Sequence, residues 1–344
     1  MRLHALQYLR AVAALAVVYS HAVIQVDSYQ QYLMEAGSFG VDIFFVISGF
    51  IMIYIAKPEN TFGQFFINRV RRVVPLYWFF LLLMAAILLA TPSVFKATVF
   101  DFEALMLSLG FIPHWSGAHP TEAWPIVAPG WSLNFEMYFY LVFAVSLFFA
   151  DRFRIAFISL VITVVFIVAQ WFDTGESAAA HFFAKSMVFE FIFGMLLAAA
   201  WKRGFRMPAS TAAWLLVLGI CLLFLKLPVP RIFEYGIPSL LIVAACLFVK
   251  AREYQWGVLL GDASYALYLS HIFVLGAVRK VLPPLLGDGP MAAYLFVALS
   301  LIICTLASVI VHKYVDNWLL RHERIPRFLA ERKDSSAVSR VASS

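Results

Sequence analysis

The chain has 344 residues, of which 63% are apolar and 13% are charged, and its mean hydropathy is +0.85. Long apolar segments recur from end to end, which excludes a soluble globular protein and predicts an all-α, polytopic membrane protein. The net charge of +6 does not indicate a nucleic-acid partner. The charges lie in short loops between apolar segments, where they set the topology and attract anionic membrane lipids.

About ten transmembrane helices are expected along the chain. The apolar stretch 99–112 carries Asp101 and Glu103, so we expect it to be an interfacial or re-entrant piece rather than an eleventh span. This pattern predicts a transmembrane domain over residues 1–318 and a polar, disordered cytoplasmic tail over 319–344. The ten expected spans lie at about 5–26, 39–56, 73–91, 131–150, 153–172, 180–201, 210–226, 234–250, 259–282 and 291–315.

The positive charges predict the orientation of the chain in the membrane. Most of the 26 Lys and Arg residues fall in loops on one side, which places both termini in the cytoplasm. The chain lacks the pattern of a cleavable signal, so the first span is expected to stay in the protein. The three cysteines, Cys221, Cys246 and Cys304, lie in apolar segments without metal-ligand spacing. We interpret them as packing residues and expect no metal.

The first span contains two ionisable residues, Arg10 and His21. They are eleven residues apart, so they share one helical face and lie ~16 Å apart along the axis. Small side chains between them, such as Ala14 and Val17, predict a groove along this face. One interpretation is a long, thin ligand with its anionic end at Arg10 and its reactive end at His21, because charge inside a membrane usually marks a functional site. The alternative is structural pairing of both residues with neighbouring helices.

A basic stretch follows the second span and contains Arg69 and Arg72. Three residues apart in a helix, they share a face, and guanidinium groups suit bidentate contacts with phosphate. Together with Arg10 on the same side of the membrane, they predict a site for a polyphosphorylated cytosolic ligand. An ordinary positive-inside loop is the alternative.

The fourth span begins at Trp131 and carries Glu136. Glu136 and His21 are expected at similar depths near the outer side, where a carboxylate would orient the imidazole and strengthen it as a base. The sequence thus predicts Glu136 and His21 as a catalytic pair, with Trp131 beside the substrate groove. The alternative for Glu136 is a hydrogen bond to a neighbouring helix.

Two further spans carry polar residues that are candidates for the groove. Ser264, Tyr268 and His271 form one stripe at i, i+4 and i+7, and such a stripe must face other helices or a cavity. In the second span, Asp42 is expected near the outer mouth and Ser48 deeper. Both sets fit either a substrate groove or helix packing.

Taken together, these stretches resemble the membrane-bound acyltransferase-3 family. The resemblance is carried, in family order, by Arg10 with His21, by "FGVDIFFVISGFIM", by Arg69 and Arg72 before "VVPLYW", and by "WSLNFEMYFY" and "GDASYALYLSH". Within the family, these stretches are most similar to those of exopolysaccharide O-acetyltransferases of the succinoglycan type. Many family members carry an additional C-terminal SGNH hydrolase-like domain. None is expected here, so a separate exopolysaccharide assembly protein would supply any acyl relay.

The resemblance implies a multi-pass enzyme of the bacterial inner membrane. It implies acetyl-CoA or a similar acyl-CoA as donor and a hydroxyl of a polysaccharide or lipid-linked glycan as acceptor. Arg10, Arg69 and Arg72 would bind the CoA phosphates, and His21 would either take the acceptor's proton or briefly carry the acyl group. Two other functions stay open, a transporter or flippase of a lipid-linked glycan and a non-catalytic assembly subunit. A transporter would favour inverted repeats and broken helices, which the sequence does not show.

Overall fold

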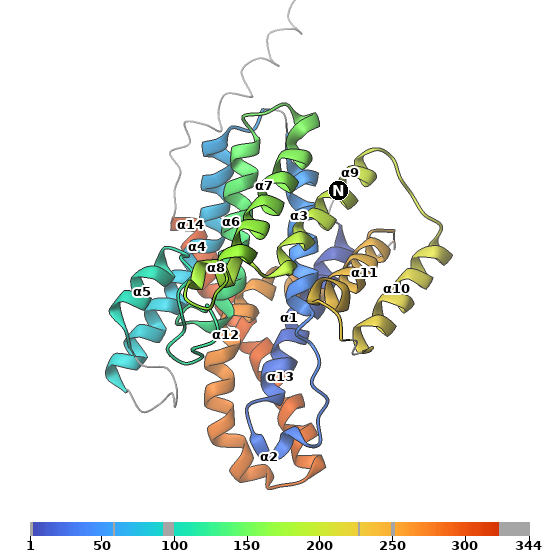
Figure 1. Cartoon of the computed structure of the whole chain (residues 1–344). Helices are drawn as coiled ribbons and strands as arrows, with labels where there is room; N and C mark the ends of the chain where they lie inside the picture. Colours follow the sequence, from blue (N-terminus) through green and yellow to red (C-terminus); the bar gives the residue numbers. More distant parts are fainter. Residues whose placement is uncertain (1–2, 58, 92–99, 226–227, 249–251, 323–344) are drawn as a thin grey trace, which may run out of the picture.

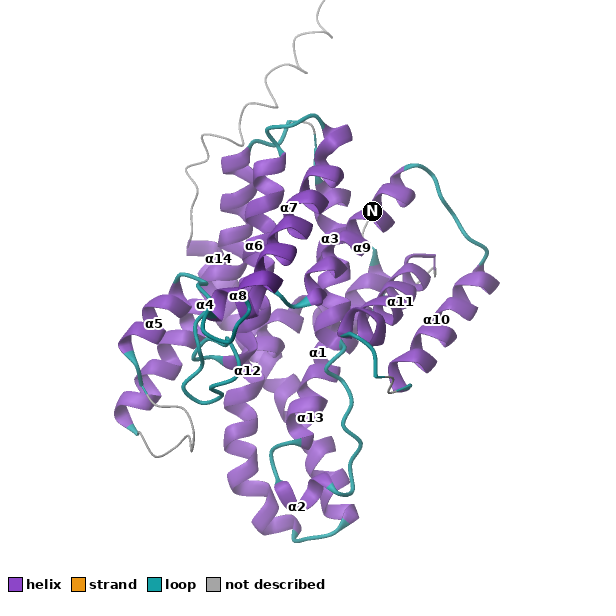
Figure 2. Cartoon of the chain, viewed as in Figure 1, coloured by secondary structure: helices purple, strands orange, loops and turns teal. Residues whose placement is uncertain are grey.

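The computed structural model describes residues 3–57, 59–91, 100–225, 228–248 and 252–322. Within these residues the regular secondary structure is entirely helical (Figure 2), as the sequence predicts. Each of the ten expected spans contains a helix. These helices are α1 His4–Val23, α3 Gly40–Ile55, α4 Phe62–Ala90, α6 Trp131–Ser146, α7 Asp151–Phe172, α9 Glu190–Lys202, α10 Ala209–Phe224, α11 Ile237–Phe248, α12 Gln255–Leu286 and α13 Pro290–Val311.

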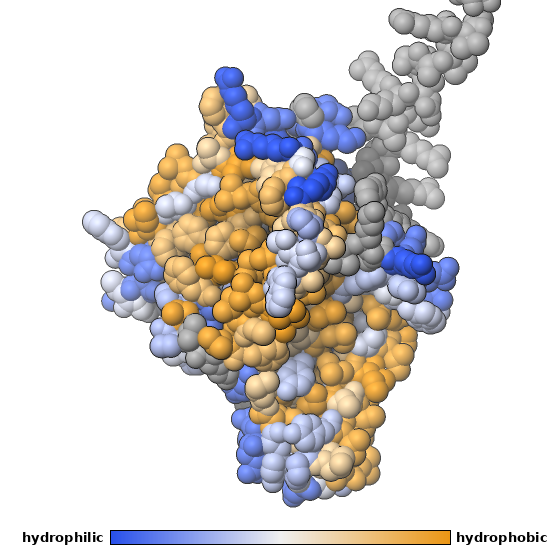
Figure 3. All heavy atoms as spheres, turned by 90° about the vertical axis from the view of Figure 1, so that its right-hand side faces the viewer, coloured by the Kyte–Doolittle hydropathy of each residue, from blue (hydrophilic) through white to orange (hydrophobic). Residues whose placement is uncertain are grey.

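Several of these helices are suited to a membrane by length and composition. Five apolar helical stretches are long enough to cross one: α1, α4, α7, α12 and Pro290–Leu320, in which α13 continues. Helices α3 and α10 are apolar but shorter. Figure 3 shows a broad apolar surface over the middle of this face, with hydrophilic residues at the upper and lower ends and at both side edges. The protein is therefore a multi-pass membrane protein, while the count of ten spans and the cytoplasmic termini stay predictions.

Short helices connect or extend the long ones. The stretch expected to be interfacial or re-entrant contains α5, Phe102–Leu109. Its eight residues reach ~12 Å, which is too short to cross a hydrocarbon core of ~30 Å. The others are α2 Asp27–Gln30, α8 Ala178–Phe183, α14 Asn317–His322, the 3-10 turns η1 Ala128–Gly130 and η2 Ser186–Phe189, and the π-helical turns η3 Ile232–Gly236 and η4 His312–Asp316. Helix α14 continues past the expected domain boundary at 318, and most of the expected disordered tail lies outside the described residues.

Glycines let the central helices approach one another closely. Helix α3 crosses α9 at Gly49 and Gly194, where a Cβ on Gly194 would lie 2.0 Å from the carbonyl oxygen of Val46. Helix α1 meets α3 in the same way, because a Cβ on Gly40 would lie 2.2 Å from the carbonyl oxygen of Ala13. Small residues at such crossings replace the missing hydrophobic driving force with close van der Waals contact.

The small residues of α1 are part of this packing. Ala13 and Ala14 have no exposed surface, and Val17 is 2% exposed. Ala14 packs in an apolar cluster with Leu267 of α12, whereas Val17 packs in the main core. The prediction of an open groove along this face of α1 is therefore wrong, because the small side chains admit neighbouring helices instead of a ligand.

The arrangement places α1 at the centre of the molecule. It runs beside α12 in the same direction, from Gln7 against Gly261 to His21 against His271. Helices α3, α4, α6 and α7 stand together in the upper half of Figure 1, while α12 and α13 continue to the lower end. The candidate site lies where α1, α3, α4, α6 and α12 meet.

Candidate functional site

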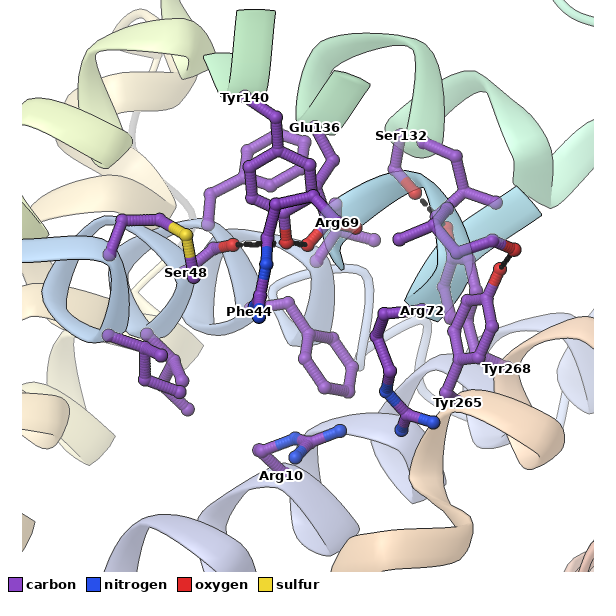
Figure 4. A pocket seen from close by; sticks show the side chains of 17 residues that line it. Arg10, Phe44, Ser48, Arg69, Arg72, Ser132, Glu136, Tyr140, Tyr265 and Tyr268 are labelled. Carbon is purple, nitrogen blue, oxygen red and sulfur yellow. Dashed lines mark hydrogen bonds between the residues drawn. The ribbon is translucent and has the colours of Figure 1, made fainter. Parts of the chain in front are cut away.

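A cavity between five helices brings most of the predicted polar residues together (Figure 4). Its lining contains cationic, carboxylate and hydroxyl side chains together with aliphatic and aromatic ones. The polar lining residues are Arg10, Ser48, Arg69, Arg72, Ser132, Glu136, Tyr140, Tyr265 and Tyr268, and the apolar ones are Val41, Phe44, Phe45, Ile47, Ile51, Met52, Leu133 and Val73.

The three predicted phosphate ligands share this cavity. Arg10 comes from α1, while Arg69 and Arg72 come from the first three turns of α4. Figure 4 shows the guanidinium groups of Arg10 and Arg72 pointing toward one another. Residues from two separate helices thus line the same cavity, while their role as phosphate ligands stays a prediction.

Arg72 is held from two sides. Its Nη1 lies 3.4 Å from Oδ2 of Asp316, and its guanidinium lies 5.7 Å from the ring centroid of Tyr265. Asp316 is 2% exposed and also lies 2.9 Å from Nδ1 of His312. The carboxylate thus orients Arg72 from η4, beyond the last expected span. Sequence reasoning missed Asp316, because no local pattern links it to α4.

Glu136 also lies in the arginine cavity. Its carboxylate accepts hydrogen bonds from Ser48 Oγ, at 3.0 Å, and from the hydroxyl of Tyr140. The sequence placed Glu136 beside His21, but the structure gives the two residues different hydrogen-bond partners. Helix α6 packs mainly on α4 and α7, whereas α1 packs mainly on α12, α3 and α13. Similar depth in the membrane did not imply contact, and the catalytic role of Glu136 stays a prediction.

His21 forms a hydrogen bond with a second histidine. Nδ1 of His21 lies 2.9 Å from Nε2 of His271, and the ring centroids are 4.9 Å apart. His271 has no exposed surface, while His21 is partly exposed. The sequence singled out both residues but did not pair them. The available signal was that each span carries one histidine on a polar face.

Tyr268 lies beside both the cavity and the histidine pair. It lines the cavity, and its ring centroid lies 6.1 Å from that of His271. Its hydroxyl bonds Ser132 Oγ at 2.7 Å and donates to the carbonyl of Pro129 at 2.8 Å. Arg10 thus lines the cavity, whereas neither His21 nor His271 does.

Of the remaining residues predicted to line the substrate groove, some line the cavity and others pack between helices. Ser48 lines the cavity, as does Tyr268, but Asp42, Trp131 and Ser264 do not. Asp42 is fully buried and forms two bonds with Arg231, of 3.1 and 2.7 Å. Trp131 packs edge-on against Phe45, and Ser264 donates to the carbonyl of Gly261 in its own helix. For Asp42 and Ser264, the helix-packing alternative describes the observed contacts, and Trp131 likewise packs against another helix.

Comparison with known proteins identifies the family. A model of the acyltransferase domain family Acyl_transf_3 matches residues 3–309. The exopolysaccharide production protein ExoZ of Rhizobium meliloti (strain 1021) is 34% identical over 303 residues, covering 86% of this chain and 93% of ExoZ. The acyltransferase MdmB of Streptomyces mycarofaciens is 25% identical over 362 residues, covering 93% and 92%.

A third relative, YrhL of Bacillus subtilis (strain 168), is described by its name as a peptidoglycan O-acetyltransferase. It is 25% identical over 331 residues, covering 79% of this chain and 50% of YrhL. No solved structure matches the chain significantly. The family match spans the helices that carry the arginine cavity and the histidine pair, and the chain belongs to the acyltransferase-3 family of membrane acyltransferases.

Proposed function

We propose that this acyltransferase moves an acetyl group from cytosolic acetyl-CoA to a hydroxyl of a cell-surface or exported polysaccharide. The observation that carries the proposal is the convergence of Arg10, Arg69 and Arg72 on one cavity between α1 and α4. The names of two relatives support the class of acceptor, because one concerns exopolysaccharide production and the other peptidoglycan O-acetylation.

The cavity has the chemistry that a CoA thioester requires. CoA carries several phosphate charges, and guanidinium groups bind phosphate through paired, charge-assisted hydrogen bonds. The nonpolar wall, with Phe44, Phe45 and Met52, suits the less polar pantetheine arm. Placing this cavity toward the cytoplasm agrees with the predicted N-in and C-in orientation in a bacterial inner membrane.

His21 is the proposed site of transfer. It lies eleven residues beyond Arg10 on α1 and outside the cavity lining, and its partner His271 lies next to Tyr268. A neutral imidazole there would take the proton of the acceptor hydroxyl in a ternary complex or carry the acyl group briefly. Both routes require the thioester to pass Tyr268. Displacement of this side chain on donor binding is therefore part of the proposal.

The test is the acetyl content of the polysaccharide made by cells with and without the chain. We expect the acetyl methyl signal in the proton NMR spectrum to disappear with the protein and return with plasmid-borne protein. Purified protein in nanodiscs should also transfer radiolabel from acetyl-CoA to the isolated polymer. A polymer whose acetylation is unchanged but whose export fails would instead support the transporter alternative and overturn this proposal.

A further inference from the structure

The structure assigns His271 of α12 as the positioning residue that determines which nitrogen of His21 reacts. This inference rests on the proposed function of His21. It starts from two contacts: His271 Nε2 lies 2.9 Å from His21 Nδ1, and His271 Nδ1 lies 3.2 Å from the carbonyl oxygen of Leu267. Together they form a short relay from the backbone of α12 to the side chain on α1.

The backbone carbonyl decides where His271 carries its proton. A carbonyl oxygen accepts hydrogen bonds and cannot donate, so Nδ1 of His271 must carry the hydrogen. A neutral imidazole protonated at Nδ1 has its lone pair at Nε2. His271 therefore presents an acceptor to His21. The carbonyl of Leu267, one turn earlier in α12, sets that arrangement.

The acceptor on His271 in turn decides the tautomer of His21. Nδ1 of His21 must donate to it, which leaves the lone pair of neutral His21 at Nε2. Nε2 is then the reacting atom. In the ternary route it takes the proton of the acceptor hydroxyl while that oxygen bonds to the acyl carbon. The thioester C–S bond breaks, and the proton passes from Nε2 to the departing CoA thiolate.

The acyl-enzyme route uses the same atom. The lone pair at Nε2 bonds to the acyl carbon and the CoA thiolate leaves. The acceptor oxygen then displaces Nε2, and the hydroxyl proton goes to the thiolate. In both routes His21 becomes cationic at an intermediate stage. The lone pair of His271 accepts a hydrogen bond from that cation and stabilises it.

Burial separates the roles of the two histidines. His271 has no exposed surface in the structure, so in this proposal it acts through His21. His21 is partly exposed and can meet both substrates. The apolar cluster that surrounds this part of the α1–α12 contact, with Val18, Ala22 and Leu275, leaves the pair little freedom to exchange partners.

The first experiment compares two substitutions of His271. In His271→Gln the amide oxygen can still accept from Nδ1 of His21, whereas His271→Leu removes the acceptor at similar size. We expect His271→Leu to lower kcat at least ~100-fold, within the ~10²–10⁴-fold range of general-base catalysis, with an unchanged KM for acetyl-CoA. His271→Gln should recover at least a tenth of the wild-type kcat.

A matched control is His114, another buried histidine, which bonds the carbonyl of Ile112 at 2.9 Å. His114→Leu should keep the wild-type kcat at equal membrane level. Equal kcat in His271→Leu and wild type would overturn the positioning role, as would an equal loss in the Gln and Leu variants.

The second experiment reads the tautomer directly. Protein labelled with ¹⁵N-histidine in nanodiscs should show, for the signal that disappears in His21→Gln, a protonated Nδ1 and an unprotonated Nε2. In His271→Leu the same residue should lose this single tautomer. A His21 protonated at Nε2 in the wild-type protein would overturn the inference without touching the proposed function. If the proposed acetyl transfer were disproved instead, the tautomer of His21 read from the spectrum would stay the same.

Discussion

At the scale of single residues, the proposed donor-binding and transfer residues occupy different places. The arginines line the cavity, whereas His21 and His271 do not. If the arginines bind the donor and His21 performs the transfer, a substitution of an arginine should change the KM for the donor and a substitution of a histidine should change kcat. Uniform binding affects KM, while interactions made only in the transition state affect kcat.

Replacing either arginine of α4 should weaken donor binding. Arg69→Ala or Arg72→Ala removes a charge-assisted contact of ~1.5–3 kcal/mol, so the KM for acetyl-CoA should rise at least ~10-fold. The KM for the acceptor should change little. Radiolabel transfer at varied concentrations of each substrate measures both constants. Arg152→Ala, an exposed arginine at the start of α7, serves as the control. If Arg69→Ala and Arg72→Ala have the same KM for acetyl-CoA as the control Arg152→Ala, the two arginines of α4 do not bind the donor.

Replacing His21 should stop transfer and spare binding. In His21→Gln the side chain can hydrogen-bond but cannot take a proton, so kcat should fall at least ~100-fold. Acetyl-CoA binding, measured by calorimetry on purified protein, should stay at the wild-type level. Near-normal acetylation by His21→Gln at matched membrane levels would show that another residue performs the transfer.

A substitution of Glu136 tests whether this residue acts in catalysis, as the sequence predicts, or modulates the charge of the arginine cavity, where the structure places it. As a carboxylate in the arginine cavity, it offsets part of the positive charge that attracts phosphate. Glu136→Gln keeps an oxygen for Ser48 and Tyr140 but removes the charge, so acetyl-CoA should bind several-fold more tightly. Calorimetry measures this affinity. Unchanged donor affinity with strongly reduced turnover would instead support the catalytic role predicted beside His21.

At the scale of helices, close crossings hold the site together. Gly49 and Gly194 bring α3 against α9, and Gly40 brings α3 against α1. Helix α3 thus positions Ser48 toward Glu136 while it packs on two other helices. The π-helical turn η4 has a comparable role, because it directs Asp316 toward Arg72. Such turns often occur at functional sites.

A methyl group at the α3–α9 crossing should destabilise the protein. Gly194→Ala would place a Cβ 2.0 Å from a backbone oxygen of α3, and the helices must separate at a cost of ~1–3 kcal/mol. The thermal midpoint of the purified protein in detergent should drop by several degrees. Gly63→Ala is the control, since nothing lies within 4 Å of a Cβ there. If both variants melt at the wild-type temperature, the helices at this crossing can separate without loss of stability.

At the scale of the whole molecule, the predicted orientation decides which substrate reaches which end of the site. Most basic loops are expected in the cytoplasm, on the side of the arginine cavity. Acetyl-CoA would then enter from the cytoplasm, and His21 would lie toward the side from which the polysaccharide approaches. This arrangement would carry an acyl group toward the outer face without exporting CoA.

Cysteine labelling tests this topology. With the three native cysteines replaced by serine, Ser116→Cys should react with a membrane-impermeant maleimide in spheroplasts. Arg203→Cys, in a loop expected on the cytoplasmic side, should react only after permeabilisation. The reverse pattern would invert the orientation and place the arginine cavity outside the cytoplasm.

The sequence by itself predicted a helix in each of the ten apolar segments, although α4 begins at Phe62, before its expected start at 73, and the expected span 180–201 is divided among α8, η2 and α9. Such helices depend on local periodicity and apolar length, which neighbouring residues set. The three-residue spacing of Arg69 and Arg72 is enough to place them on one face, and the acyltransferase-3 motifs identify the family. The stretch around Asp101 was expected not to span the membrane, and the shortness of α5 agrees.

Only the tertiary structure decided which faces meet. His21 and His271 are 250 residues apart along the chain, and Arg72 and Asp316 are 244 apart. Local patterns specify the depth and direction of a side chain but not the helix opposite it, so Glu136 is predicted beside His21 but lies with Ser48 and Tyr140. The small residues of α1 led to a wrong prediction for the same reason. A stripe of alanines permits close approach, and only the packing of α3 and α12 shows that helices, rather than a ligand, occupy it.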